Sequence, residues 1–267
     1  MAQTTTGEGQ EAFRTHHNYI RSLRFLIEGS TLSHFDVKRI VPGPIPLLDT
    51  KKNLIELTKK SLNDEANIVR KDQDYSYAST SWLPVKTYYL LFNVMMTIEY
   101  LLTLDPGSFK IGHAACSTRF TTRLASGEIS FNEPKLNATY NRQILLYHEP
   151  AGANLRSPSL QYSSVKLALK KIAQYKLEDW QRSKKIPSFA LQKHRLAKEA
   201  FLNKFRISIF DFPYYMRLRA SYRDFAFIEG VSSVNTAAYF DDYFAFSRCL
   251  YRALRDLKDH LVKARTA

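Results

Sequence analysis

Two pairs of arginine and histidine have a spacing that suits metal-free cleavage of RNA. Five residues separate Arg142 from His148, and four separate Arg255 from His260. In such a reaction one basic group takes or orients the proton of the 2′-hydroxyl, while a neighbouring cation stabilises the charge on the scissile phosphate. These four residues are therefore the candidate catalytic residues, and an Arg and a His on one helix face would suffice.

A second group combines arginine with tyrosine between residues 214 and 225. Guanidinium groups bind phosphates in a forked geometry and aromatic rings stack on unpaired bases, so this composition suits single-stranded nucleic acid. The alternative places the aromatic side chains in the core and pairs the arginines with Asp211, Asp224 or Glu229. The candidate nucleic-acid-binding residues here are Arg217, Arg219, Tyr222 and Arg223.

The positive charge of the chain is concentrated in one third of its length. The net charge is +14 in total. Residues 1–137 hold 16 basic and 14 acidic side chains, residues 138–223 hold 17 and 5, and residues 224–267 hold 6 of each. Such an asymmetry indicates an anionic partner. Nucleic acid is the favoured candidate, and an acidic protein or a membrane surface is less favoured. A solvated basic face is the alternative. Two basic amphipathic helices are expected in this region, and their polar sides add the candidates Lys170, Lys171, Lys193 and Arg195. Their apolar sides are expected to face inward, with Val165, Leu169 and Ile172 in the first helix and Leu191 and Phe201 in the second.

With these residues in view, the chain resembles the HEPN superfamily of helical bundles. Arg255 and Asp256 followed by His260 match the Arg, polar residue and His of that family's motif. The segment 81–89, leading through an apolar helix to His113, is similar to helical bacterial proteins of the YaaC-like kind. The segment 215–224 lies where HEPN proteins have their Arg-containing motif, but Tyr222 stands in place of the histidine.

The resemblance implies a homodimer that acts as a metal-independent endoribonuclease in an antiviral defence or toxin-type system. A degenerate member would bind RNA without cutting it. The resemblance covers residues 80–265 loosely.

Common cofactor and metal motifs are absent from the sequence. The chain has no phosphate-binding glycine-rich loop, no nucleophile elbow and no HExxH zinc motif. No two histidines stand three or four positions apart, so we expect neither metal nor cofactor. The carboxylate pair Asp241 and Asp242 is expected to serve as helix caps or to lie in a solvated loop. Cys116 and Cys249 are far apart in sequence and are expected to be free thiols in a reducing, cytoplasmic compartment.

Hydrophobic periodicity predicts a mainly α protein, a multi-helix bundle with a short irregular or β segment near 128–139. We expect a disordered N-terminus over 1–10, a helical region over 11–155 and a basic helical region over 156–267, which can form one continuous domain. The apolar segment 83–104 is expected to be a core helix with Pro84 in its first turn, and a membrane-facing helix is the alternative. The segment 206–227 is expected to be one helix, entered at residues 211–213.

The sequence thus predicts a protein that binds nucleic acid, with RNA favoured and no membrane partner. The alternative is a non-catalytic subunit whose basic region docks an acidic protein or scaffolds a nucleoprotein complex.

Overall fold

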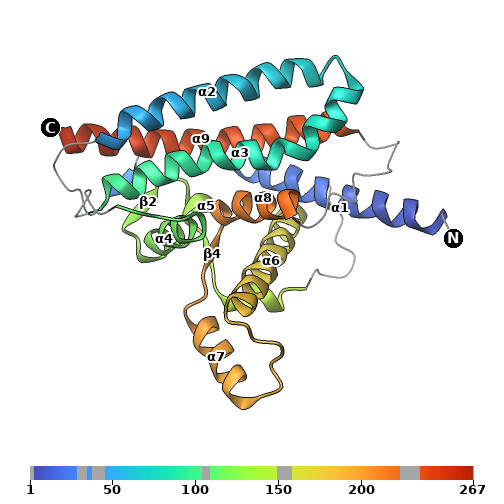
Figure 1. The fold of residues 1–267 in the computed structure, drawn as a ribbon, viewed down its shortest axis with the longest axis vertical. Coiled ribbons are helices and arrows are strands. Elements are labelled where there is room, and N and C mark those ends of the chain that lie inside the picture. Colours follow the sequence, from blue (N-terminus) through green and yellow to red (C-terminus); the bar gives the residue numbers. More distant parts are fainter. Residues whose placement is uncertain are drawn as a thin grey trace.

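The structure is built from helices, with two very short strand pairs (Figure 1). The computed structural model describes residues 3–28, 35–37, 46–103, 109–148, 158–222 and 235–266. The elements are α1 (Gln3–Glu28), β1 (Phe35–Val37), α2 (Pro46–Val69), α3 (Gln73–Leu101), α4 (His113–Ser126), β2 (Ile129–Phe131), α5 (Pro134–Asn137), β3 (Thr139–Tyr140), the 3₁₀ helix η2 (Arg142–Leu146), α6 (Pro158–Ser183), α7 (Gln192–Asn203), β4 (Ile207–Ser208), the 3₁₀ helix η3 (Ile209–Asp211), α8 (Phe212–Tyr222) and α9 (Thr236–Thr266). The prediction of a mainly α bundle with a short β segment is confirmed.

The apolar helix α3 is a core helix, as predicted. It contacts α2, α4, α8 and α9, and its side chains Leu83, Leu91 and Ile98 are buried. It begins earlier than predicted, because the Asp72 carboxylate accepts the backbone N–H of Tyr75 at 2.9 Å and caps the helix there. Pro84 consequently lies inside the helix instead of in its first turn. None of the described helices is long and apolar enough to cross a membrane.

Helix α9 joins the two halves of the chain. It contacts α1, α2 and α3, and large aromatic side chains such as Tyr239, Tyr243 and Phe246 are fully buried along it. Together with α6 and α8 these helices surround one hydrophobic cluster, to which both the 11–155 and the 156–267 regions contribute. The region boundary expected near residue 156 therefore does not separate two cores within the described residues.

The segment 128–139 forms strands, but its strands do not pair with each other. β2 pairs antiparallel with β1, so that Phe131 lies opposite Phe35, and β3 pairs with β4, so that Tyr140 lies opposite Ile207. The intervening helical turn α5, capped by Glu133, directs the two strands to different partners. Sequence periodicity identifies a strand but not a partner that is distant in the chain.

Two further expectations differ from the structure. The N-terminal stretch expected to be disordered is helical from Gln3 onward. Once the buried part of a helix has formed, each residue added to its end makes one more backbone hydrogen bond, which favours extension of the helix. In the segment 206–227, α8 begins at Phe212, which agrees with the entry expected at residues 211–213. The residues before it form β4 and η3 instead of helix, since the Ser208 and Asp211 side chains form a capping box that starts a new element. The residues after Tyr222 in that range lie outside the described part.

Candidate nucleic-acid interface

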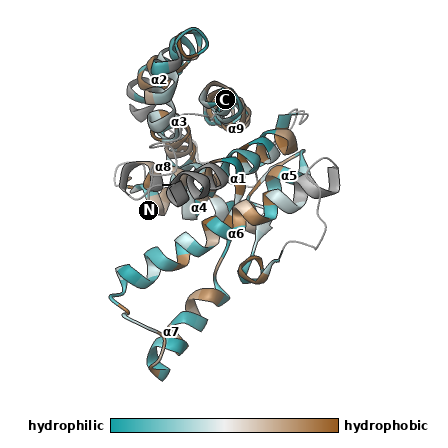
Figure 2. Ribbon diagram, turned by 90° about the vertical axis from the view of Figure 1, so that its right-hand side faces the viewer, coloured by the Kyte–Doolittle hydropathy of each residue, from teal (hydrophilic) through white to brown (hydrophobic). Residues whose placement is uncertain are grey.

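The far end of α6 and the whole of α7 extend away from the layer formed by α2, α3 and α9 (Figure 1). We call residues 176–206 the α6–α7 projection. It contains nine basic and three acidic residues, a net charge of +6. Figure 2 shows most of α7 and the adjoining end of α6 coloured as hydrophilic, on an arm that leaves the body of the molecule. A large share of the basic excess predicted for residues 138–223 is therefore gathered on one protruding element.

The projection is held in shape by a few specific contacts. The rings of Trp180 on α6 and Phe201 on α7 stack with centroids 4.5 Å apart and planes 14° from parallel. At its base, Lys176 Nζ donates to the carbonyl of Arg206 at 2.8 Å and lies 5.7 Å from the centroid of the Phe205 ring. The two helices are thus fixed at these points.

An open groove lies between α6 and α7. Its volume is about 610 Å³, and its lining is Trp180, Lys184, Ile186, Lys193, His194, Ala197, Ala200 and Phe201. The aromatic pair and the two alanines form an apolar floor, and Lys184 and Lys193 are exposed. Neither lysine has a carboxylate partner among the described residues, so both charges are available to an anion.

The four basic candidates on α6 and α7 are not equivalent. Lys193 lines the groove, and Arg195 is exposed on the same helix, where its Nη1 donates to the carbonyl of Ala190 at 3.1 Å. Lys171 is exposed nearer the body of the molecule, with its Nζ 5.6 Å from the centroid of the Tyr175 ring. Lys170 donates to the carbonyl of Tyr147 at 2.6 Å, so it fastens η2 to α6.

Arg217, a candidate on α8, is packed against tyrosines of α3. Its guanidinium lies 5.6 Å and 5.4 Å from the ring centroids of Tyr88 and Tyr89, and Nη2 donates to the Tyr89 hydroxyl at 3.2 Å. It is only partly exposed. The side chains of Arg219 and Tyr222, and the whole of Arg223, lie outside the described residues.

Of the three carboxylates expected as alternative partners of those arginines, Asp224 and Glu229 lie outside the described residues, and Asp211 is engaged elsewhere. Asp211 is 1% exposed and accepts hydrogen bonds from Ser117 at 2.5 Å and Thr121 at 2.7 Å. The backbone N–H of Ser208 donates to it at 2.8 Å, and Lys176 Nζ lies 3.8 Å away. Asp211 therefore links α4 to the start of α8.

The Arg255 and His260 side chains point to different sides of α9. Five positions correspond to about 140° around a helix axis, because 3.6 residues make one turn. Arg255 bonds the neighbouring Asp256 carboxylate at 2.6 Å and lies on the side of α9 that approaches Lys59 of α2. His260 is exposed. The structure does not bring this pair together.

The Arg142 and His148 pair lies in a different part of the molecule. Arg142 Nη1 donates to the Glu199 carboxylate at 3.0 Å and to the Asn203 side chain at 3.2 Å, so it joins η2 to α7. His148 is exposed in the segment that follows η2. Since Arg255 lies beside α2 and Arg142 beside α7, the two pairs occupy separate surfaces of one chain (Figure 1).

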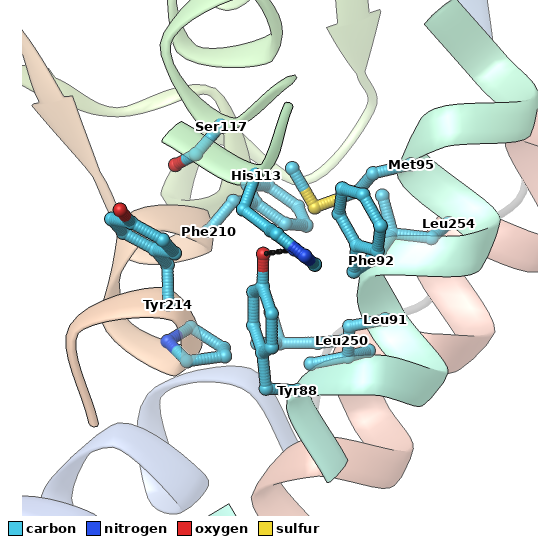
Figure 3. Close-up of a pocket in the computed structure, with 11 residues that line it drawn as sticks. Tyr88, Leu91, Phe92, Met95, His113, Ser117, Phe210, Tyr214, Leu250 and Leu254 are labelled. Carbon is cyan, nitrogen blue, oxygen red and sulfur yellow. Dashed lines mark hydrogen bonds between the residues drawn. The ribbon is translucent and has the colours of Figure 1, made fainter. Parts of the chain in front are cut away.

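A second concave feature, between α3, α4, α8 and α9, is closed (Figure 3). Its space is about 10 Å³, roughly that of one water molecule. The Tyr88 hydroxyl lies 2.8 Å from His113 Nδ1, and the Phe92 ring packs 4.1 Å from the His113 ring. Burial, followed by the charge of Arg217, lowers the pKa of His113. These side chains pack the helices against one another and leave no room for a substrate.

The groove residues Trp180, Lys184 and Phe201 were not singled out as binding residues from the sequence. Phe201 was assigned to the buried face of its helix, and it does face α6. A clue was present in the tryptophan four residues before the dibasic Lys184-Lys185, which places an aromatic ring and a cation on one helix face.

No group of three metal-binding side chains occurs among the described residues. Both cysteines are free thiols, Cys116 in the core and Cys249 partly buried.

No protein-family model matches the chain, and neither a curated protein nor a solved structure is significantly similar to it. The resemblance to HEPN proteins therefore stays a prediction.

Proposed function

We propose that the protein binds nucleic acid through the α6–α7 projection. The observation that supports this most directly is the pair of exposed lysines, Lys184 and Lys193, which border an open groove and have no carboxylate partner among the described residues. Cations that are not paired within the protein release the counterions of a polyphosphate when they bind it, and this release drives association. RNA is the favoured ligand, as the HEPN resemblance implies.

In this proposal the protein binds RNA, and neither of the two Arg–His pairs cleaves it. Arg255 and Arg142 are both engaged by carboxylates of the same chain, and neither contacts its histidine among the described interactions. A non-catalytic role also agrees with the tyrosine at position 222, where HEPN proteins have histidine.

Charge neutralisation on the projection tests this proposal. The double variant Lys184→Gln/Lys193→Gln is compared with Lys52→Gln/Lys60→Gln, which removes the same charge from exposed positions of α2. Fluorescence anisotropy with labelled RNA is measured over a range of salt concentrations. If both lysines contact phosphates, the projection variant loses affinity and its logarithmic salt slope falls in magnitude by about 1.4 to 1.8, while the α2 variant resembles the wild type.

Two results would contradict the proposal. Equal losses in the two double variants would mean that only overall charge matters. Competition by polyglutamate as effective as competition by RNA would favour the alternative, in which the projection docks an acidic protein.

A further inference from the structure

Electrostatic attraction alone does not distinguish a duplex from a single strand. The shape and lining of the groove between α6 and α7 suit a single strand. We propose that this groove accepts an unpaired base of a single-stranded nucleic acid, which stacks beside Trp180 and Phe201 while Lys184 and Lys193 contact the flanking phosphates. This inference rests on the proposed function and adds the class of ligand to it.

The dimensions of the groove fit such a ligand. Its volume of about 610 Å³ is in the range of small-molecule clefts, roughly 300–1,000 Å³. Ala197 and Ala200 leave space on the α7 side of the groove, because the side chain of each is only a methyl group. A longer side chain at either position would occupy the space in front of the aromatic pair.

The aromatic pair offers a stacking surface. Trp180 and Phe201 are nearly parallel and only partly buried, and both line the groove. A planar base that lies against them extends the stack, and every base has an aromatic face, so the contact tolerates any sequence. In a duplex the bases are already stacked on one another, and their faces are not accessible.

The charged residues are placed to hold the backbone on both sides of the base. Lys184 stands at the end of α6 and Lys193 in the first turn of α7, so they belong to opposite walls of the groove. Lys198, another cation of α7, lies 4.6 Å from the ring centroid of Phe189 in the connection between the helices. The aromatic floor is thus bordered by cations, which is the arrangement expected for a single strand whose phosphates face outward.

The two tryptophans of the chain allow a direct test. Trp82 is 59% exposed on α3, away from the projection, so Trp82→Phe leaves Trp180 as the single tryptophan in a full-length protein. A single-stranded RNA and a duplex of the same length are titrated, with Trp180 fluorescence and the anisotropy of labelled RNA followed in parallel. We expect the single strand to quench Trp180 at the concentration where anisotropy reports binding. The duplex is expected to bind without quenching.

Two substitutions add an affinity measurement. Trp180→Ala is expected to weaken single-strand binding by about 5- to 150-fold and to leave duplex binding nearly unchanged. Ala200→Leu fills the groove from an exposed position of α7 with a good helix former, so it is expected to weaken single-strand binding while the fold is retained. Ala78→Leu, at an exposed position of α3, is the matched control.

The outcomes separate the two proposals. If anisotropy reports binding of the single strand without quenching, or if Ala200→Leu binds like Ala78→Leu, base stacking in the groove is overturned while nucleic-acid binding stands. If neither the single strand nor the duplex binds, nucleic-acid binding itself is overturned.

Discussion

One carboxylate, Asp242, fastens the N-terminal helix to the C-terminal one. Its Oδ2 lies 2.8 Å from His17 Nε2, and its Oδ1 accepts Arg24 Nη1 at 2.5 Å. Burial raises the pKa of Asp242, but hydrogen bonds from His17 and Arg24 outweigh it and hold the pKa below its usual value. From the sequence, Asp241 and Asp242 suggested caps or solvated loops. Their partners, more than 170 positions away in the chain, could not be predicted from local pattern.

Replacing this carboxylate is expected to destabilise the protein in a pH-dependent way. At neutral pH, Asp242→Asn should lower the free energy of unfolding by about 1–3 kcal/mol, because the guanidinium of Arg24 loses a charged acceptor. A lowered carboxyl pKa contributes stability that is fully present above the unfolded value of about 3.9 and is lost as pH falls through the lower, folded value. The difference between variant and wild type should therefore shrink below about pH 4.

Urea unfolding at several pH values measures this difference. Asp259→Asn on the same helix is the control, since Asp259 is 51% exposed and pairs only with the adjacent Lys258 among the described contacts. Its effect should stay within about 0.5 kcal/mol. Equal stability of the two variants at neutral pH would refute the role assigned to Asp242.

Among the elements, the end of α6 has an unusual backbone. Lys185 has φ of 52°, the only positive φ of a non-glycine residue in the described part of the chain. The N–H of Ile186 bonds the carbonyl of Gln181 at 3.1 Å, and the N–H of Lys185 bonds that of Arg182 at 2.9 Å. This is the Schellman ending of a helix, in which glycine usually takes the left-handed position. Lys185 places a positive charge next to the groove, but its left-handed backbone conformation is strained.

Glycine at this position should therefore improve stability and impair binding. Lys185→Gly is expected to raise the free energy of unfolding by up to about 1 kcal/mol. Removing the strain of the left-handed backbone stabilises the folded state by more than the larger loss of backbone entropy of glycine destabilises it. RNA affinity should fall, because a cation of the projection is removed. Thermal unfolding and anisotropy measure the two effects.

The neighbouring substitution Lys184→Gly is an informative control. It removes the same charge, but at a position with ordinary negative φ, so it should lower stability by about 0.5–1 kcal/mol. If both variants change stability in the same direction, the strain assigned to Lys185 is not significant.

Helix periodicity predicted most elements, while their boundaries and partners depended on tertiary structure. The basic helices α6 and α7 were expected from the spacing of Val165, Leu169 and Ile172 and of the residues near Phe201. Leu191, expected to face inward, is instead 54% exposed, because it precedes α7 at the far end of the projection, away from the core. An amphipathic pattern predicts which side of a helix is apolar, but not how much of that side is covered.

At the scale of the whole molecule, the charge count predicted where basic residues gather better than the Arg–His spacing predicted which side chains meet. A local excess of lysine and arginine remains an excess in any fold, and here half of the net charge of residues 138–223 lies on one protruding arm. A catalytic pair requires two side chains to meet, and their meeting depends on the turn of the helix and on competing carboxylates such as Asp256 and Glu199.

The separation of the two Arg–His pairs leads to a prediction for the intact protein. After EDTA treatment, the wild type is expected to bind RNA and to leave it uncut. His148→Ala and His260→Ala should bind with wild-type affinity, because neither histidine lies on the groove. Denaturing gels of labelled RNA check this. Cleavage by the metal-free protein that either substitution abolishes would overturn it and would restore the HEPN-like ribonuclease prediction, with a dimer required to assemble the site.

The continuity of α6 has a mechanical consequence. Val165, Leu169 and Ile172 are buried in the core, and the same unbroken helix continues to Trp180 in the groove. At 1.5 Å per residue, a helix of 26 residues is a stiff rod about 39 Å long. The α6–α7 projection is therefore a rigid arm whose base is anchored in the core. Tension on a bound strand would load the buried side chains of α6 directly, without a flexible linker to absorb it.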